Sequence, residues 1–382
     1  MSSSLRSVLL PFFMLLLAVP AAAQSPWGDW PFPDAGLDGE SIDKARIQSA
    51  PFWFNSRPLF TVAEDPGGQK GIVSLDASLK GKAVLIHFWD YTNAHTLEMI
   101  PILSAWRTRY GKDGLVIVGV QAPQFPFAAL PRNVAAAIRR LGVDYPVYLD
   151  SDFLVWRIFS NRHWPRSILV APGGQVVDDS VGSNDSQATE TAIRLTIGKR
   201  TGKVYREPLL PPPQSGRAGT TCHKRSPDLP CGFEQGRLGS PGYKKDGTVT
   251  AYTVPAHAEV RQDGVMYPAG AWRATREALL TAGSSPWELR LRFEAVALAL
   301  VASPPEGANG AEVVVTLDGA PVPAALRGAD LREGPGGQTL LALDSPRLYR
   351  VIGNAPFGKH EIVLTPRQAG TRLYVFYFDG CE

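Results

Sequence analysis

The sequence predicts an α/β domain followed by an all-β domain. Strand-like and helix-like segments alternate over residues 58–200, whereas residues 239–382 contain strand-like segments with almost no helical periodicity. Between them, residues 201–238 include the stretch PLLPPPQSGRAGTT, whose proline content is typical of an extended linker. A chain of 382 residues is long enough for two domains, each with its own hydrophobic core.

Apolar runs and capping residues define the elements of the first domain. The run AVLIHFW predicts a buried strand and LVIVGV a second one. Asn93 or Thr92 is expected to cap a helix that continues to about Tyr110. Further predicted elements are a helix capped by Asn133 and ended by Gly142, a strand at 145–150, a helix at 153–159, a hairpin at 167–179 and a helix at 185–199.

The second domain consists of short apolar runs separated by Gly, Pro and Asp turns. This pattern is typical of an antiparallel β-sandwich. The predicted strands are TVTAYTV, ELRLRFEAVALALVA, AEVVVTLDG, QTLLALD, RLYRVI, HEIVLTP and TRLYVFYF.

The N-terminus has the features of a targeting segment. Residues 1–23 contain Arg6, an apolar run over 8–19 and the small residues of 21–23, which together predict a cleavable signal peptide. The following residues, 24–57, are rich in aromatic residues and proline and are expected to form a lead-in that packs on a domain. The expected location is therefore periplasmic or secreted, with no membrane span after signal cleavage.

Charge and cysteine content limit the possible functions. The 39 basic and 36 acidic residues leave a net charge of +3, which does not favour nucleic-acid binding. In an oxidising compartment, Cys222 and Cys231 are expected to form a local disulfide around the loop HKRSPDLP. Three cysteines leave at least one without an internal partner. Cys381 could be free, could pair between chains or could compete for one of the other two.

One stretch and its surroundings resemble a known family. The stretch FWDYTNAHTLEMIP (88–101) follows a buried strand, and a later WP precedes another strand. Both are similar to the redoxin domain of DipZ-type proteins, which are linked to cytochrome c biogenesis and have a thioredoxin-like fold. The C-terminal stretches SPDLPCGFEQGR, YPAGAW, VTLDG and PRLYRVI resemble the carbohydrate-binding-module-like β-sandwich of the same family. The resemblance covers about residues 50–380.

The resemblance implies that the residues of the family's redox reaction are replaced. Asn93 and Thr96 stand at the two positions of the family's CxxC cysteines, and Pro165 stands at its cis-proline. Thiol–disulfide exchange needs a thiolate and a second, resolving thiol, which neither Asn93 nor Thr96 provides. Both residues are instead expected to hold the start of the helix. His87 occupies the position of a buried acid that serves proton transfer in many thioredoxins.

The predicted function is therefore that of a redox-inactive binding or scaffold module in the cell envelope. The groove between the 93–96 loop and Pro165, which holds an extended peptide in active relatives, is the expected binding surface for a peptide or protein partner. The candidate groove residues are Trp89, Tyr91, His95 and Trp164.

Two alternative functions follow from other residues. The distal cysteines could support thiol–disulfide oxidoreductase or antioxidant activity as in the redoxin family. The sandwich could instead bind a glycan, because aromatic faces stack on sugar rings; the same aromatic residues are otherwise expected to fill the core of the sandwich. The aromatic residues concerned are Trp272, Trp287, Tyr252 and Tyr267.

No cofactor is expected from the sequence. His95 and His163 could face the same groove, but two histidines without a metal-binding spacing do not predict a metal site. The chain also has no G-x-S-x-G motif of a serine hydrolase.

Overall fold

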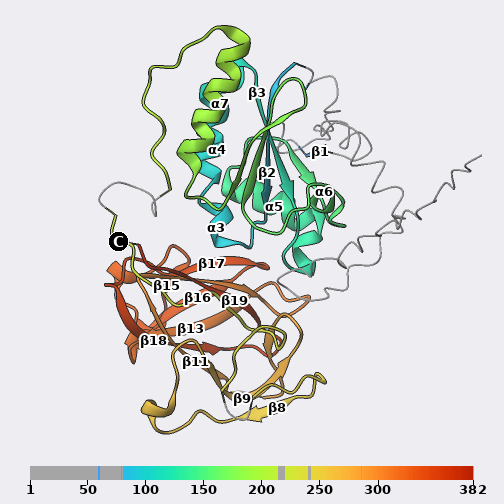
Figure 1. The fold of residues 1–382 in the computed structure, drawn as a ribbon. Helices are drawn as coiled ribbons and strands as arrows, with labels where there is room; N and C mark the ends of the chain where they lie inside the picture. Colours follow the sequence, from blue (N-terminus) through green and yellow to red (C-terminus); the bar gives the residue numbers. More distant parts are fainter. Residues whose placement is uncertain are drawn as a thin grey trace, which may run out of the picture.

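The computed structural model shows an α/β domain that packs on an all-β domain (Figure 1). The predicted signal peptide and lead-in, residues 1–57, lie outside the described residues. Within the part of the chain that is described, no helix is both long enough and apolar enough to cross a membrane. The described residues are 59–60, 79, 81–213, 220–239, 242–284 and 286–381.

A six-stranded sheet forms the centre of the first domain, with the strand order β1–β4–β3–β2–β5–β6. Strands β2, β3 and β4 are parallel, and β1, β5 and β6 pair antiparallel with their neighbours. This is the thioredoxin-like arrangement that the sequence predicted, including the β5–β6 hairpin. The strands are β1 (Leu59–Phe60), β2 (Ala83–Trp89), β3 (Leu115–Gln121), β4 (Val147–Leu149), β5 (Arg166–Val170) and β6 (Val176–Val181).

Helices cover both faces of this sheet. Leu85 and Trp89 of β2 belong to the cluster packed against α4, α5 and α7, whereas Ile86 and Phe88 belong to the cluster with α6. Successive residues of a strand point to opposite faces, so a central strand covered on both sides is apolar throughout. The helices are α3 (Ala94–Leu97), α4 (Ile100–Tyr110), α5 (Pro131–Leu141), α6 (Leu154–Ile158) and α7 (Ser186–Thr201).

The observed bounds of two helices differ from the predicted ones. The helix predicted from Asn93 to Tyr110 is divided into α3 and α4, and Pro101, which has no amide hydrogen to donate, lies in the first turn of α4. Helix α5 begins at Pro131 and not after Asn133, because proline favours the first helical position. Gly142 ends α5 in the left-handed conformation, with φ 65°, as predicted.

The second domain is a β-sandwich whose two layers form one continuous, nearly barrel-like sheet. Strand β9 connects the layers: its first half pairs with β11 and its second half with β8 and β10. Gly270 lies at this change of partner with φ +86°, and a Cβ atom there would lie 2.2 Å from the carbonyl oxygen of Pro286. Glycine is therefore required where the strand passes from one layer to the other.

The run predicted as a single strand over 288–302 divides at Val296. Its first part, β11, pairs with β18 and its second part, β12, with β17 and β19. The larger strands are β9 (Met266–Ala274), β11 (Glu288–Ala295), β12 (Ala297–Ser303), β13 (Ala311–Leu317), β16 (Thr339–Leu343), β17 (Arg347–Ile352), β18 (Gly358–Pro366) and β19 (Arg372–Asp379). The shorter strands are β7 (Leu229–Pro230), β8 (Thr250–Tyr252), β10 (Leu279–Thr281), β14 (Ala320–Pro321) and β15 (Leu331–Glu333).

Part of the predicted linker belongs to the second domain. Strand β7 pairs antiparallel with β19, and Cys222 forms an isolated antiparallel bridge with Cys381. Cys222, β7 and Cys231 therefore lie along the C-terminal strand, and this part of the predicted linker is not only a spacer.

The two domains share a hydrophobic cluster. Along β19, Ala302 pairs with Leu373 and Val301 with Val375, so Tyr374 is the extra residue of a β-bulge. The bulge directs Tyr374 to the first domain, where its ring centroid lies 5.0 Å from that of Phe125. Residues of the second domain in this shared cluster are Ala278, Val301, Leu348, Tyr374, Val375 and Tyr377.

Replacement of Tyr374 by alanine should destabilise the protein strongly. The side chain is 7% exposed and contacts both Phe125 and Phe127. Removal of a buried aromatic ring costs about 3 kcal/mol. Urea denaturation should show this loss for Tyr374→Ala, whereas Val249→Ala, at a side chain that is 41% exposed, should change the free energy of unfolding by less than about 0.5 kcal/mol. Equal effects of the two substitutions would contradict the interface described here.

Candidate functional site

The loop after β2 begins α3 with an asparagine cap. The Asn93 side-chain oxygen accepts hydrogen bonds from the amides of His95 (3.0 Å) and Thr96 (3.3 Å). Its backbone is extended, with φ −98° and ψ 118°, as at other helix N-caps. The structure therefore confirms the capping role predicted for Asn93.

Thr96 is fully buried behind the cap. Its hydroxyl lies 2.5 Å from the carbonyl oxygen of Asp90 and 2.9 Å from that of Asn93, and it can donate to either. A threonine nucleophile needs a base that accepts its proton, and here the proton is directed at backbone carbonyls. Thr96 thus stabilises the loop and is not arranged for attack on a substrate.

Asp90 forms a buried acidic centre below this loop, which the sequence analysis did not single out. Its carboxylate accepts hydrogen bonds from the Thr92 hydroxyl, the Gln121 side chain (3.1 Å) and the Gln124 amide (2.9 Å). Burial raises its pKa to about 6 in spite of these bonds. The only sequence signal for this centre is an acidic residue directly after an apolar strand.

His87 lies on β2 behind the loop, as predicted. Its Nδ1 is 2.9 Å from the Ser167 hydroxyl, and burial lowers its pKa to about 3. The imidazole is therefore neutral behind the loop.

The second domain covers the loop. The Tyr377 hydroxyl donates to the Gln124 side-chain oxygen (3.0 Å), which also accepts from the Asn93 side-chain nitrogen (3.4 Å). The His95 Nε2 atom lies 3.0 Å from an Asp228 carboxylate oxygen, and this hydrogen bond raises the pKa of His95 above its usual value. Asn93 is consequently only 6% exposed.

A cavity of about 1090 Å³ remains between the two domains beside the covered loop. Its first wall comes from α3, the cis Trp164–Pro165 peptide and Ser183. Its second wall comes from β12, β17, β19 and the chain around Cys381. The structure therefore confirms that Pro165 is a cis-proline and places it beside α3. The charged residues that line the cavity are Glu98, Arg225, Arg327, Arg350 and Asp379.

Two of the four predicted groove residues lie elsewhere. His95 and Trp164 line the cavity, as expected. Trp89 and Tyr91 are at most 1% exposed, because Trp89 faces the helices and Tyr91 packs on Phe127 below the second domain. Their prediction as groove residues was wrong.

The two histidines considered for a metal do not share the cavity. His95 lines it and pairs with Asp228, whereas His163 is exposed and is not part of its lining. Across the described ranges, no three His, Cys, Asp or Glu side chains are grouped as a metal site would require.

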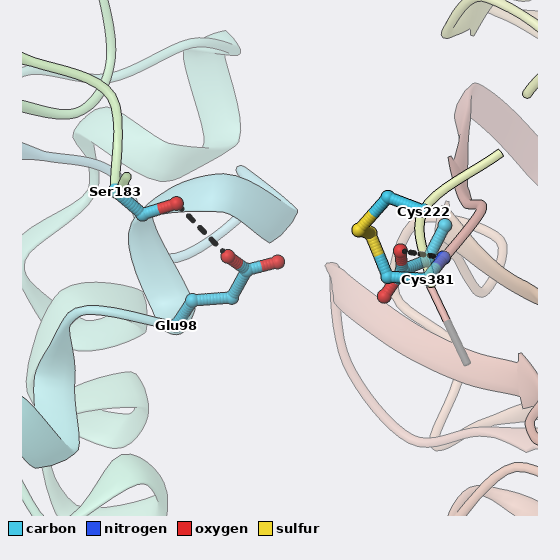
Figure 2. The surroundings of a disulfide bond; sticks show 5 residues. Glu98, Ser183, Cys222 and Cys381 are labelled. Atoms are coloured by element: carbon cyan, nitrogen blue, oxygen red, sulfur yellow. Dashed lines mark hydrogen bonds between the residues drawn. A yellow bond between two sulfur atoms is a disulfide. The ribbon is translucent and has the colours of Figure 1, made fainter. Parts of the chain in front are cut away.

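The disulfide differs from the predicted one. Cys222 pairs with Cys381 (Figure 2). Cys231 is free and fully buried. Cys231 follows β7 and packs in the core of the second domain, whereas the segment at Cys222 runs antiparallel to the chain after β19. The two cysteines are 159 residues apart in the sequence. The sequence analysis allowed for this pair only by noting that Cys381 could compete for one of the other two cysteines.

The aromatic residues considered for glycan stacking fill the core. Trp272, Trp287, Tyr252 and Tyr267 are all at most 7% exposed. The Trp272 and Trp287 side chains donate to the carbonyls of Ala269 and Ala282, respectively (both 2.8 Å). Their rings therefore offer no open face to a sugar.

The buried Asp90 should make stability depend on pH. Because its folded-state pKa of about 6 exceeds the unfolded value of about 3.9, its contribution to stability is complete below about pH 4 and is lost as pH rises through about 6. At each pH, the effect of Asp90→Asn is the difference in the free energy of unfolding between the variant and the unaltered protein. We expect this destabilisation to be larger at pH 4 than at pH 7, by up to about 3 kcal/mol. Urea denaturation at both pH values measures this difference.

The comparison is internally controlled. His87 gives the opposite pH dependence, since its lowered pKa destabilises the folded protein as pH falls below about 6.5, but it does so in both proteins. An identical effect of Asp90→Asn at the two pH values would show that Asp90 does not retain its proton on folding.

Comparison with known proteins gives the following similarities. Residues 232–379 match the family described as "Thioredoxin like C-terminal domain". Protein DipZ of Mycobacterium bovis is 38% identical over 138 residues, which are 36% of this chain and 19% of DipZ. NHL repeat-containing protein 2 of Gallus gallus is 30% identical over 156 residues, or 38% of this chain and 22% of that protein. The chain thus spans about a fifth of the length of these relatives.

Among solved structures, a thioredoxin-like protein in its oxidized form is 20% identical, with a TM-score of 0.33. The similarity covers 40% of this chain and 96% of that protein.

Proposed function

We propose that this chain, a redoxin-domain protein of the DipZ type, is a peptide-binding module whose thioredoxin-like loop no longer performs thiol–disulfide exchange. One observation carries the proposal: Asn93 and Thr96, which the family resemblance aligns with the redox positions, are buried and use their polar atoms to hold the loop. Exchange at this loop would need an accessible thiolate. The N-terminal targeting pattern supports a location in the cell envelope or outside the cell.

The architecture around the loop supports binding. The cavity between α3, Pro165 and the second domain has a volume of about 1090 Å³, at the upper end of the usual range for ligand pockets of about 300–1,000 Å³. Apolar side chains such as Leu97 and Trp164 line it together with charged groups, a composition suited to an extended peptide.

The charges of the cavity favour an acidic peptide. Three arginines and two acidic residues line it. Arg225 pairs with Asp228 and Arg327 with Glu333, whereas among the described residues the Arg350 guanidinium has no ion-pair or hydrogen-bond partner. Guanidinium groups bind carboxylates in a bidentate manner, so Arg350 is the expected contact of an acidic side chain.

The redox silence of the loop can be tested by insulin reduction with dithiothreitol. In a background with Cys222→Ser and Cys381→Ser, the unaltered loop should give only the rate of dithiothreitol alone. Adding Asn93→Cys and Thr96→Cys should leave the rate at this level as well, because the second domain covers both positions and a thiolate there would not be accessible. Activity with the unaltered loop would refute the proposal, and activity of the restored pair would show that the second domain does not close the loop to a substrate.

Peptide binding can be tested by calorimetric titration with an extended acidic heptapeptide and its lysine-substituted counterpart. The acidic peptide should bind more tightly, and Arg350→Glu should weaken its binding at least about tenfold, since a charged hydrogen bond contributes about 1.5–3 kcal/mol. Arg273→Glu is the matched control, because Arg273 is exposed on β9 and lies outside the cavity. Equal affinities for the two peptides would contradict the assigned role of Arg350.

A further inference from the structure

The Cys222–Cys381 disulfide lies in the wall of the cavity opposite α3. Cys381 lines the cavity together with its neighbours Asp379 and Gly380. Figure 2 shows the Glu98 side chain pointing from the opposite wall into the space before the disulfide, held by the Ser183 hydroxyl (3.1 Å). The disulfide therefore lies across the cavity from Glu98, the residue that ends α3.

The disulfide is accessible, unlike the third cysteine. Cys222 is exposed and Cys381 is half-buried, whereas Cys231 is completely buried and burial raises the pKa of its thiol. Thiol–disulfide exchange needs access to a sulfur atom, so only the disulfide meets this requirement in the described structure.

The position of the disulfide allows it to open without loss of the sheet. Cys381 follows the end of β19 and Cys222 precedes β7, so neither belongs to a strand. Strand β19 is held independently by β12, β10 and β7. Reduction can therefore remain a local event at the rim of the second domain.

We propose that Cys222–Cys381 is a thiol–disulfide exchange site that accepts two electrons from a dithiol protein bound in the cavity. This exchange site rests on the proposed function, because the dithiol protein would bind in the same cavity that is proposed to bind a peptide partner. It also places a redox element of this chain on the wall opposite the replaced pair of Asn93 and Thr96.

The exchange balances as two successive displacements. A thiolate of the partner attacks one sulfur, the disulfide bond breaks, and the departing cysteine takes up a proton. The second thiol of the partner then attacks the mixed disulfide and releases the other cysteine. The partner leaves oxidised to a disulfide, and this chain holds two thiols, having received two electrons and two protons.

The surroundings assign different roles to the two sulfur atoms. Cys381 lines the cavity and Cys222 does not, so a partner in the cavity reaches Cys381 first. Lys224 stands two positions after Cys222, and positive charge stabilises a departing thiolate. Attack on Cys381 with departure of Cys222 is therefore the favoured direction.

Thiol labelling of the unaltered chain under native conditions tests the site. The chain is incubated with a reduced CxxC thioredoxin or with dithiothreitol alone, alkylated with a maleimide and analysed by mass spectrometry. We expect label on Cys222 and Cys381, none on the buried Cys231, an unchanged circular dichroism spectrum, and a rate at least about tenfold higher with the dithiol protein at equal thiol concentration.

Two outcomes would overturn the inference. Absence of label under native conditions would make the disulfide a structural link only, and simultaneous labelling of Cys231 would show that reduction requires unfolding. A variant without the disulfide could lose stability, so the unaltered chain is the primary material.

The direction of attack has its own test. A thioredoxin whose second CxxC cysteine is replaced by serine should form a mixed disulfide with Cys381, and Lys224→Glu should slow this step severalfold. Lys245→Glu, at an exposed lysine that does not line the cavity, is the matched control and should leave the rate unchanged. A mixed disulfide on Cys222 would overturn the assigned direction.

Failure of this inference is distinguishable from failure of the proposed function. The heptapeptide titration does not depend on the disulfide, and reduction by dithiothreitol does not depend on peptide binding. Peptide binding without labelling would refute only the exchange site, whereas labelling without peptide binding would refute only the peptide-binding role.

Discussion

The packing of β19 on the loop at Asn93 is the contact on which the rest of the site depends. A bulge at Tyr374 places its ring between the domains, and Tyr377 donates to Gln124, which in turn accepts from Asn93. These bonds join the start of α3 to the C-terminal strand inside a hydrophobic cluster, where an unpaired polar group would be costly. The loop is therefore a structural element of the interface, and the space left for a partner is the adjoining cavity.

This contact also explains why an asparagine suits the start of α3. A thioredoxin-type cysteine must meet its substrate in solution, whereas the residue here must satisfy two helix amides and a neighbouring amide oxygen while nearly excluded from water. Asparagine provides one acceptor and two donors in one short side chain. Thr96 completes the arrangement by donating to backbone carbonyls, which a thiol does only weakly.

The sequence was sufficient where the determinants are local. The buried strand β2, the cap at Asn93, the helix end at Gly142 and the hairpin β5–β6 follow from patterns of a few residues, and the family resemblance located the cis-proline at Pro165. The failures concern contacts between distant segments. Tyr91 is buried by a domain whose strands begin more than a hundred residues later, and Cys222 pairs with a residue 159 positions away. Sequence spacing favours a disulfide between cysteines that are close in the sequence. In the folded chain, the C-terminal strand instead lies beside the linker, so Cys381 meets Cys222.

The same distant pairing determines where redox chemistry remains possible. A disulfide between Cys222 and Cys231 would have lain with the core of the second domain, where Cys231 is inaccessible to a thiolate. Pairing with Cys381 instead places one cysteine on the cavity wall and leaves the second, Cys222, exposed near Lys224. Under the proposed exchange, the sulfur atom offered to a partner is therefore that of Cys381, on the wall opposite α3, and the disulfide acts there as the oxidised partner of a dithiol.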